Sequence, residues 1–449
     1  MAKMLRKYIR YLGQDSKLKN NEFKEVCLFW FPLFTTWLLM GLENPTTSSL
    51  VARLDNAKEN LAAFGVAFAV GLLVESPIIN LLSAVAAKCR DVSTYILLRK
   101  FAMSLNFAVL FIHCIILLPP VFDLIFLDLV GLTDNVASLT HEALCYLILW
   151  PPLVGVRRFY QGVMVADGKT KKIAYGTSLR LFTVGCLVFY FVYIKILNGA
   201  AAGCLTLSIA VTVEAIYIYV ASKPSQRKFL SIKKSAADQL NLRELVSYYS
   251  PLAQTSMLGL AFQPVLTFFL ARSVNPVESL AAFPVANGFV FMFRTVGLSV
   301  TEVYLVFMER NKEYLLALKK LTAVLIVSCL LLYAFLAFTG GAKYIVTNAL
   351  GLDVALSEIT TNAIKVFTPL VAGTILLSYY RAQVMLWSKT IYLSRGTAIE
   401  ISLVLILVWI FVDFLSWDGA FSAALALVLA RFVQIGYVYK MLRKEKKLA

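Results

Sequence analysis

The sequence has few charged residues and almost no histidine. Of its 449 residues, 15% are charged and two are histidines, whereas a soluble chain carries about 25% charged residues. Two isolated histidines and seven cysteines without a CxxC pair form no metal-ligand pattern. The sequence also lacks a GxxxxGK[ST] nucleotide-binding loop and any catalytic cluster. These absences argue against an enzyme, a metal site, a cofactor and a pump that hydrolyses ATP itself.

Apolar residues dominate the chain and make up 59% of it. A helix needs about 20 apolar residues to cross a bilayer, and twelve segments meet this condition. The sequence therefore predicts an all-α polytopic membrane protein. The predicted spans are roughly residues 26–50, 61–86, 94–118, 138–165, 174–196, 199–221, 245–270, 279–307, 318–338, 359–386, 394–415 and 419–440.

Basic residues occupy alternate connections between these spans. The first 25 residues are basic and lack the apolar region and cleavage site of a secretory signal. Cytoplasmic loops collect Lys and Arg, so we expect both termini to be cytoplasmic, in a bacterial inner (plasma) membrane. The same rule accounts for the net charge of +17 without nucleic-acid binding. The basic connections are 88–100, 169–172, 223–243, 310–320, 389–395 and 440–447, and the acidic one is 119–142.

The sequence contains an internal repeat. PLFTTWLLMGLENPTTSSLVARLDNAKENLAAF (residues 32–64) matches PLAQTSMLGLAFQPVLTFFLARSVNPVESLAAF (residues 251–283), 219 positions further on. The polar segment 223–244 is predicted to be a cytoplasmic linker between an N-terminal lobe, 1–222, and a C-terminal lobe, 245–449. Matched positions include Pro32/Pro251, Thr36/Thr255, Pro45/Pro264, Arg53/Arg272, Glu59/Glu278, Lys169/Lys389 and Gly176/Gly396.

Each copy of the repeat has six spans. Because six is even, both copies enter the bilayer from the same side, so the repeats are parallel and related by an axis along the membrane normal. Such repeats enclose a central cleft, bind substrate near mid-depth and rock to give alternating access. This architecture favours a secondary transporter over a channel or a membrane enzyme. We expect the transporter to be a monomer.

Two large transporter groups are built from parallel six-helix repeats. The major facilitators usually carry a Gly-Asp-Arg-rich loop after span 2, whereas here that loop reads AAKCRDVSTYILLRK. Residues 157–171, RRFYQGVMVADGKTK, are instead similar to the end of span 4 in the multidrug/oligosaccharidyl-lipid/polysaccharide (MOP) exporter superfamily. This superfamily includes the MATE (multidrug and toxin extrusion) transporters, so the resemblance implies a MATE-like fold.

Within this superfamily the chain most resembles the progressive ankylosis protein family. The similarity is spread over all twelve spans, and it implies an exporter of organic or phosphorylated polyanions such as citrate, ATP or pyrophosphate. The features that carry it are Pro32-Leu33, Glu43, Glu59 with the following run Leu61–Phe68, Thr301-Glu302, Arg381-Ala382-Gln383, Lys389-Thr390 and the ending GAFSAALALVLARFVQIGYVYKMLRKEKK.

Four arginines are predicted to lie deep in the spans. A charge at mid-bilayer costs roughly 3 kcal/mol on insertion scales, so each needs a reason. The planar guanidinium donates two hydrogen bonds at once to a carboxylate or phosphate and stays protonated. Arg294, Arg381, Arg157 and Arg158 are therefore candidate ligands of a small anionic substrate. The alternative is that they form static ion pairs inside the bundle.

Acidic residues in the spans are candidates for gating or coupling. Glu75 and Arg294 are repeat partners and could pair across the cleft until an anionic substrate competes for the arginine. Glu302 could carry a proton, and the coupling ion could be H+ or Na+. Arg180 and Glu400, also repeat partners, are predicted to snorkel toward the cytoplasmic surface.

The first span of each repeat contains a proline next to polar residues. Glu43 and Asn44 precede Pro45, and Gln263 precedes Pro264. Because proline removes a backbone donor, a kinked or unwound helix is expected here. Asn44 and Gln263 are candidate substrate ligands, while Glu43 and the two prolines are candidate gating elements.

Two other functions remain open from the sequence. A flippase for an anionic lipid-linked headgroup would use the same basic cleft but would need a lateral opening for the lipid tail. A cation-drug antiporter of the MATE type would depend on Glu43 or Glu75.

Overall fold

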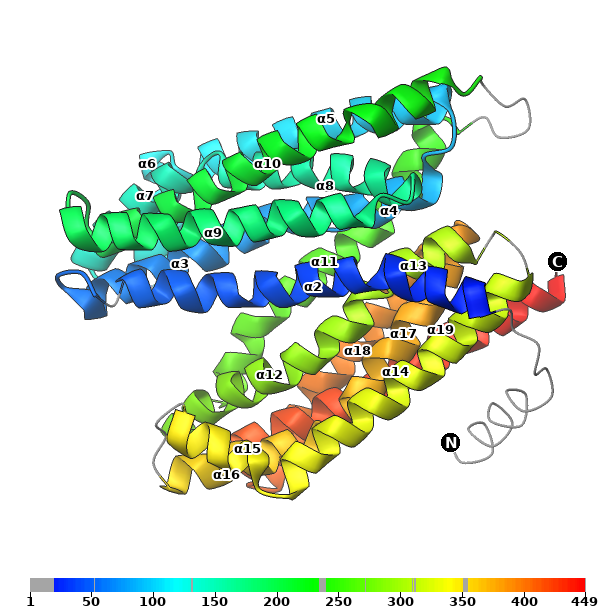
Figure 1. Ribbon diagram of the computed structural model, residues 1–449. Coiled ribbons are helices and arrows are strands. Elements are labelled where there is room, and N and C mark those ends of the chain that lie inside the picture. Colours follow the sequence, from blue (N-terminus) through cyan, green and yellow to red (C-terminus); the bar gives the residue numbers. More distant parts are fainter. Residues whose placement is uncertain are drawn as a thin grey trace. The chain divides into compact units, whose positions relative to one another are not determined.

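The computed structural model describes residues 20–448 apart from 52, 131, 234–239, 271, 309, 311 and 350–353. The side chains of some further residues inside helices, among them Asn44, Pro45, Gln263 and Pro264, also lie outside this description. Within the described ranges the chain is built from helices, without a β-strand (Figure 1).

The first half of the chain runs from α2 to α10. Its elements are α2 (Asn20–Val51), α3 (Ala57–Glu75), the 3-10 turn η1 (Ser76–Ile78), α4 (Leu81–Lys88), α5 (Val92–Ile116), α6 (Pro119–Asp123), the π-helix η2 (Leu124–Leu129), α7 (Asp134–Leu147), α8 (Trp150–Ala166), α9 (Thr170–Ile194) and α10 (Gly199–Ser231).

The second half repeats this order. Its elements are α11 (Leu242–Leu270), α12 (Pro276–Ser299), α13 (Thr301–Phe307), α14 (Lys312–Phe338), α15 (Gly341–Tyr344), the π-helix η3 (Ile345–Ala349), α16 (Val354–Val366), α17 (Thr368–Leu386), α18 (Ile391–Trp409), the π-helix η4 (Ile410–Phe414) and α19 (Gly419–Leu448).

The helices agree with the predicted membrane spans. Among the described residues, ten are long and apolar enough to cross a bilayer, and α16 with α17, bent by 40°, makes an eleventh. The 29-residue α11 covers the predicted seventh span. The prediction of an all-α polytopic membrane protein is confirmed. The largest boundary difference is at α10, which continues to Ser231, into the predicted linker, where Ser225 and Lys228 bind the buried carboxylate of Asp167.

The chain forms two compact units. Unit 1 comprises residues 1–34 and 263–449, and unit 2 comprises residues 35–262. The start of α2 therefore packs with the second half of the sequence, and most of α11 packs with the first half. In these two segments the units differ from the predicted lobes, which divide the chain at the linker.

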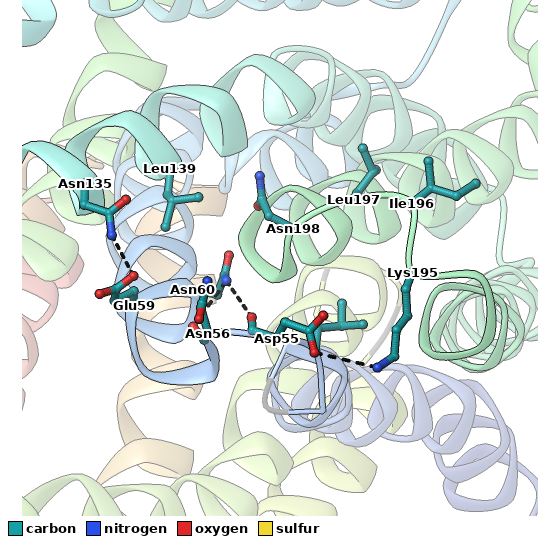
Figure 2. A pocket seen from close by; sticks show the side chains of 11 residues that line it. Asp55, Asn56, Glu59, Asn60, Asn135, Leu139, Lys195, Ile196, Leu197 and Asn198 are labelled. Atoms are coloured by element: carbon teal, nitrogen blue, oxygen red, sulfur yellow. Dashed lines mark hydrogen bonds and ion pairs between the residues drawn. The ribbon is translucent and has the colours of Figure 1, made fainter.

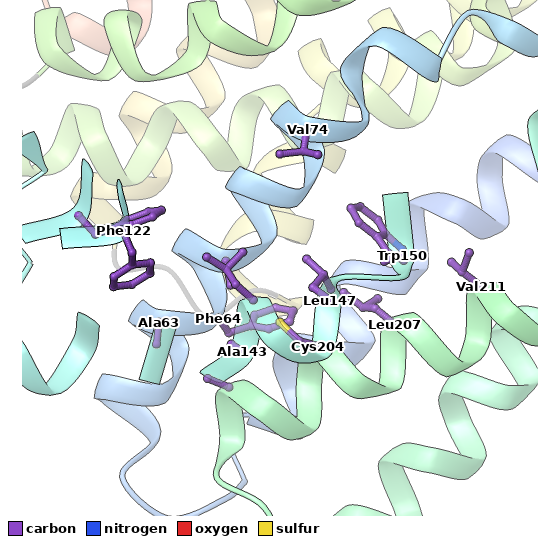
Figure 3. Packing of buried hydrophobic residues seen from close by; sticks show 14 of the residues in the cluster. Ala63, Phe64, Val74, Phe122, Ala143, Leu147, Trp150, Cys204, Leu207 and Val211 are labelled. Atoms are coloured by element: carbon purple, nitrogen blue, oxygen red, sulfur yellow. The ribbon is translucent and has the colours of Figure 1, made fainter. Parts of the chain in front are cut away.

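Unit 2 is organised around α8 and α10. Helix α10 packs against α3, α7, α8 and α9, and α8 packs against α4 and α5. Figure 3 shows the apolar cluster in which Phe64, Leu147 and Trp150 meet Cys204 and Leu207 of α10. In unit 1 the corresponding contacts join α12 to α16, α17 and α19, and α18 to α19.

Small residues at the start of α10 let the helices approach closely. A Cβ on Gly203 would lie 2.8 Å from a ring carbon of Phe64, so no larger side chain fits there without movement.

Repeat-equivalent residues make equivalent bonds in the two units. The amide of Ala200 donates to the Asn60 side chain at 2.9 Å, and the amide of Gly419 donates to Ser279 at 3.1 Å. In each unit this bond ties the start of the last span to the start of the second. The sequence repeat therefore extends to the way each bundle is closed.

Candidate functional site

Four charged side chains form a buried network in unit 2. The Arg180 guanidinium on α9 contacts the carboxylate of Glu43 on α2, and it reaches Glu214 on α10 at 3.2 Å. Arg157 on α8 donates to the same Glu214 oxygen at 2.7 Å. The exposed fractions are 0% for Glu214, 2% for Arg157, 4% for Arg180 and 8% for Glu43. Two positive and two negative charges thus compensate one another away from solvent.

Uncharged groups complete the shell around Glu214. Thr177 donates to its second oxygen at 3.1 Å, and Gln161 donates to it at 3.3 Å. A carboxylate taken out of water needs this kind of saturation, because an uncompensated buried charge costs several kcal/mol. Glu214 therefore acts as the centre that fixes α8, α9 and α10 to one another.

The prediction that Arg180 snorkels to the surface is wrong. The guanidinium stays buried because Glu43 and Glu214 on neighbouring helices supply the opposite charge. Its repeat partner Glu400 was predicted to snorkel as well. Glu400 is instead buried at 7% exposure and accepts a bond from Arg431 at 2.7 Å.

A second set of charges in unit 2 lies beside this network. Arg158 is 7% exposed and stands over the ring of Trp37, 5.8 Å from its centroid. Glu75, at the end of α3, is also 7% exposed, and its strongest electrostatic partner is Arg158. Together with the network, the described membrane spans of unit 2 hold three buried arginines and three buried glutamates. The charges of these six side chains balance, which leaves none of them for an anion to neutralise.

The interior of unit 1 has a different charge balance. Arg294 on α12 has no hydrogen bond or ion pair within the described part of the chain, and its Nε is buried. Its nearest electrostatic neighbours are Arg431 first and then Glu400, which are already paired with each other. Arg294 is therefore a positive charge inside a span with no ion-pair partner of its own among the described residues, because the carboxylate that acts on it, Glu400, is paired with Arg431.

Two further predicted residues belong to unit 1. Arg381 is partly buried on α17, and Glu302 on α13 is 6% exposed. At the deep described positions of unit 1, the three partly buried arginines Arg294, Arg381 and Arg431 are matched by two buried glutamates, Glu302 and Glu400, so this set carries one more positive than negative charge. The predicted pairing of Glu75 with Arg294 would join the two units and stays a prediction.

The prolines of α2 and α11 do not interrupt these helices. α2 is unbroken over Asn20–Val51 and α11 over Leu242–Leu270, so the predicted unwinding is not seen. Membrane helices tolerate proline where neighbouring groups satisfy the backbone. The side chains of the predicted ligands and gates Asn44, Pro45, Gln263 and Pro264 lie outside the described residues.

The helix breaks lie in spans 2 and 8 instead, and each receives a bond that the sequence analysis missed. In unit 2 the Tyr249 hydroxyl donates to the carbonyl of Pro77 at 2.6 Å. In unit 1 Trp30 donates to Ser299 at 2.8 Å, and Ser299 donates to the Val296 carbonyl at 2.8 Å.

These two bonds are equivalent in the repeat. Trp30 and Tyr249 are 219 positions apart, as are Pro77 and Val296. The same carbonyl is thus reached directly in one unit and through a serine in the other. Two amphipathic aromatic residues in matching register were the sequence signal for this pair.

A polar pocket of about 320 Å³ lies at the end of unit 2 that carries the 195–198 connection. Figure 2 shows its polar side chains bound to one another: Asn135 donates to Glu59 at 2.6 Å, and Lys195 lies 3.7 Å from Asp55. None of the predicted site residues lines it. Its polar side chains bind one another across the connection between α9 and α10.

No family model and no curated protein sequence matches the chain. Solved structures do match in fold. The Vibrio cholerae MATE transporter VcmN in its bent form has a TM-score of 0.71 and 14% identity over 96% of this chain and 99% of its own. An outward-facing multidrug resistance MATE transporter of the MOP superfamily has a TM-score of 0.73 and 15% identity over 94% and 96%.

A third neighbour is a MOP superfamily transporter from Pyrococcus furiosus. It has a TM-score of 0.71 and 15% identity over 94% of this chain and 96% of its own, and its binding pocket is described as having reverse polarity. At this level of identity the likeness establishes the fold alone. The chain has the fold of the MATE transporters, and membership of the progressive ankylosis family stays a prediction.

Proposed function

We propose that this protein is a secondary transporter that exports small anions by alternating access of two lobes. The observation that carries the proposal is Arg294, a guanidinium inside a span with no counter-ion among the described residues. A second positive charge, on Arg431, is its strongest electrostatic neighbour. A bound carboxylate or phosphate would neutralise this excess and accept the free N–H donors.

The contrast between the two units supports an anionic substrate. In unit 2 every deep arginine lies near a glutamate, so its charges serve the bundle itself. A cation-binding site would require the opposite excess. The reverse-polarity pocket of the Pyrococcus furiosus transporter is a precedent for altered pocket charge on this fold. Citrate, ATP and pyrophosphate are the first substrates to examine.

Glu43 is the best candidate for coupling to an ion. One of its oxygens contacts Arg180, and Oε1 is buried without a hydrogen-bond partner among the described residues. A proton or Na+ at this oxygen would weaken the attraction to Arg180 and loosen α2 from α9. Coupling to H+ or Na+ would then act through unit 2, while the substrate binds in unit 1.

A cation-drug antiporter is the second candidate, because one of the structural neighbours is a multidrug resistance transporter. It would need a carboxylate available to the drug. Glu43 is held by Arg180, and Glu75 lies beside Arg158.

We further propose that the protein is a monomer in a bacterial inner membrane, with both termini in the cytoplasm.

Flux from proteoliposomes tests the proposal. Citrate, ATP and pyrophosphate are compared with ethidium in the wild type, in Arg294→Gln, and in Arg272→Gln. Arg272 is a suitable control because it is an exposed arginine of the same unit, 3.2 Å from Asp413. We expect anion flux to be lost in Arg294→Gln and retained in Arg272→Gln. Anion flux that survives in a folded Arg294→Gln protein, or flux of ethidium alone, refutes the anion proposal.

A further inference from the structure

Unit 1 contains an apolar pocket of about 300 Å³. Most of its wall belongs to α12, the helix that carries Arg294. Gly288 faces open space, since nothing lies within 4 Å of a Cβ built there. The lining residues are Leu270, Leu280, Phe283, Pro284, Asn287, Gly288 and Phe291.

Arg294 lies on the same face of α12 as this pocket. Leu280, Asn287 and Arg294 follow one another at intervals of seven residues, and seven residues bring a helix back to within about 20° of the starting direction. The rise of about 1.5 Å per residue places Arg294 about 10 Å beyond Asn287 and about 4.5 Å beyond Phe291. Arg294 is not itself a lining residue, but it lies on the pocket side of α12, about one helical turn beyond the lining residue Phe291.

This face also carries polar groups that lipid would not favour. Arg294 and Asn287 share it, and a guanidinium turned to lipid at mid-span is costly. Pro284 lies inside α12 and cannot donate the usual helical hydrogen bond to the carbonyl of Leu280, another lining residue. A cationic end, an apolar middle and a few polar groups are typical of a ligand site.

We propose that Arg294 and this pocket are the two ends of one binding site, and that its substrate is an amphipathic anion. Such a molecule has one carboxylate or phosphate for the guanidinium and an aromatic or branched aliphatic body for the pocket. The inference rests on the proposed anion transport and narrows it. Citrate and pyrophosphate would satisfy Arg294 but leave the apolar end unfilled.

The test is a binding series on the purified full-length protein. Straight-chain carboxylates from acetate to dodecanoate, phenylacetate and citrate compete with a fluorescent aryl carboxylate. Burial of each methylene is worth about 0.8 kcal/mol, so affinity should rise about fourfold per added carbon. The gain should stop once the pocket is full, and the uncharged alcohols of equal length should bind weakly because they cannot pair with Arg294.

Two glycine variants separate the pocket from general effects. Gly288→Leu fills the hollow and should remove the dependence on chain length while acetate binding is kept. Gly185→Leu is the matched control, since Gly185 also faces open space but lies on α9 of unit 2. It should leave the whole series unchanged.

The outcomes distinguish this inference from the proposed function. Anion binding that needs Arg294 but ignores chain length overturns the amphipathic substrate and leaves the anion transporter standing. The pocket assignment is also overturned if affinity keeps rising to the longest chains, or if the dependence of affinity on chain length survives in Gly288→Leu. If carboxylates bind no better than the alcohols, both proposals fail.

Discussion

Replacing Glu214 by glutamine removes the carboxylate that holds two buried arginines. Glu214 is fully buried and pairs with Arg157 at 2.7 Å and with Arg180 at 3.2 Å. After the substitution Glu43 is the only carboxylate left in the network. One positive charge then stays buried without compensation, and breaking a buried pair in this way costs about 3–5 kcal/mol.

A matched control in the other unit involves an exposed pair. Asp413→Asn breaks the pair with Arg272, whose side chain is 53% exposed. Exposed pairs contribute about 0–1 kcal/mol, so this variant should resemble the wild type. Apparent melting temperatures of the detergent-solubilised variants are compared by rank, because membrane proteins commonly unfold irreversibly.

A double variant shows whether charge is the cause. Adding Arg157→Gln to Glu214→Gln removes one charge of each sign and leaves Arg180 with Glu43. The double variant should therefore be more stable than the single Glu214→Gln variant. The reasoning is refuted if Glu214→Gln has the same apparent melting temperature as Asp413→Asn. It is also refuted if adding Arg157→Gln to Glu214→Gln lowers the melting temperature further.

Two further predictions concern the ends of the spans. Burial opposes ionisation of Asp167, but hydrogen bonds from two lysines and a serine outweigh it and lower the pKa of Asp167. Its contribution to stability is therefore present above about pH 4 and lost as the pH falls through the depressed folded-state pKa, so melting curves of wild type and Asp167→Asn should converge in acid. Tyr249→Phe removes the bond to the Pro77 carbonyl, and Trp30→Phe removes the equivalent bond in the other unit. A hydrogen bond of this kind is worth about 1 kcal/mol, so each variant should have a lower apparent melting temperature than the wild type. If Tyr249→Phe and Trp30→Phe melt at the same temperature as the wild type, these two bonds do not support the helix breaks.

The fold could be predicted because its signals are local or periodic. Apolar segments of span length and a repeat at a fixed offset are visible without knowing which helices touch. The membrane spans and the internal repeat could therefore be predicted from the sequence alone. The bent pair α16 and α17 was predicted as one segment, since its apolar run continues through the bend.

The charge network could not be predicted, because it depends on which helices are neighbours. Arg180 and Glu43 are 137 positions apart, and nothing in either segment indicates the other. Without the partner, a deep arginine looks like one that must reach the surface. The same reasoning misplaced Glu400, whose partner Arg431 comes from α19.

The helix breaks show a different limit. Proline at position 45 predicted a kinked or unwound helix, yet α2 is not unwound and span 2 breaks at Ser76–Ile78. Helix α12 ends at Ser299 without a proline nearby. The residue of span 2 that is equivalent to Ser299 in the repeat is Asn80. A local rule on proline could not identify these breaks, because hydrogen bonds with another helix support them: Trp30 donates to Ser299, and Asn80 donates to the carbonyl of Leu252.

The charge excess of unit 1 leads to a prediction about Glu400. Its carboxylate is paired with Arg431 and is also an electrostatic neighbour of Arg294. Glu400→Gln should destabilise the unliganded protein, because Arg431 then lacks its counter-ion. The same change should strengthen binding of an anion at Arg294, since a repelling charge has been removed. We take the repulsion between the Glu400 carboxylate and the bound anion as about 1.4 kcal/mol, at an effective dielectric constant near 20. Removing this repulsion lowers the Kd of the anion roughly tenfold.

The measurement is isothermal titration with one carboxylate, over a range of salt concentrations. Asp413→Asn removes an exposed carboxylate of the same unit and should leave the Kd unchanged. Added salt screens an exposed site far more than a buried one, so the difference between Glu400→Gln and wild type should persist at high salt. If Glu400→Gln binds the anion more weakly than wild type, Glu400 is itself part of the site, and Arg294 is not the free positive charge that the anion neutralises.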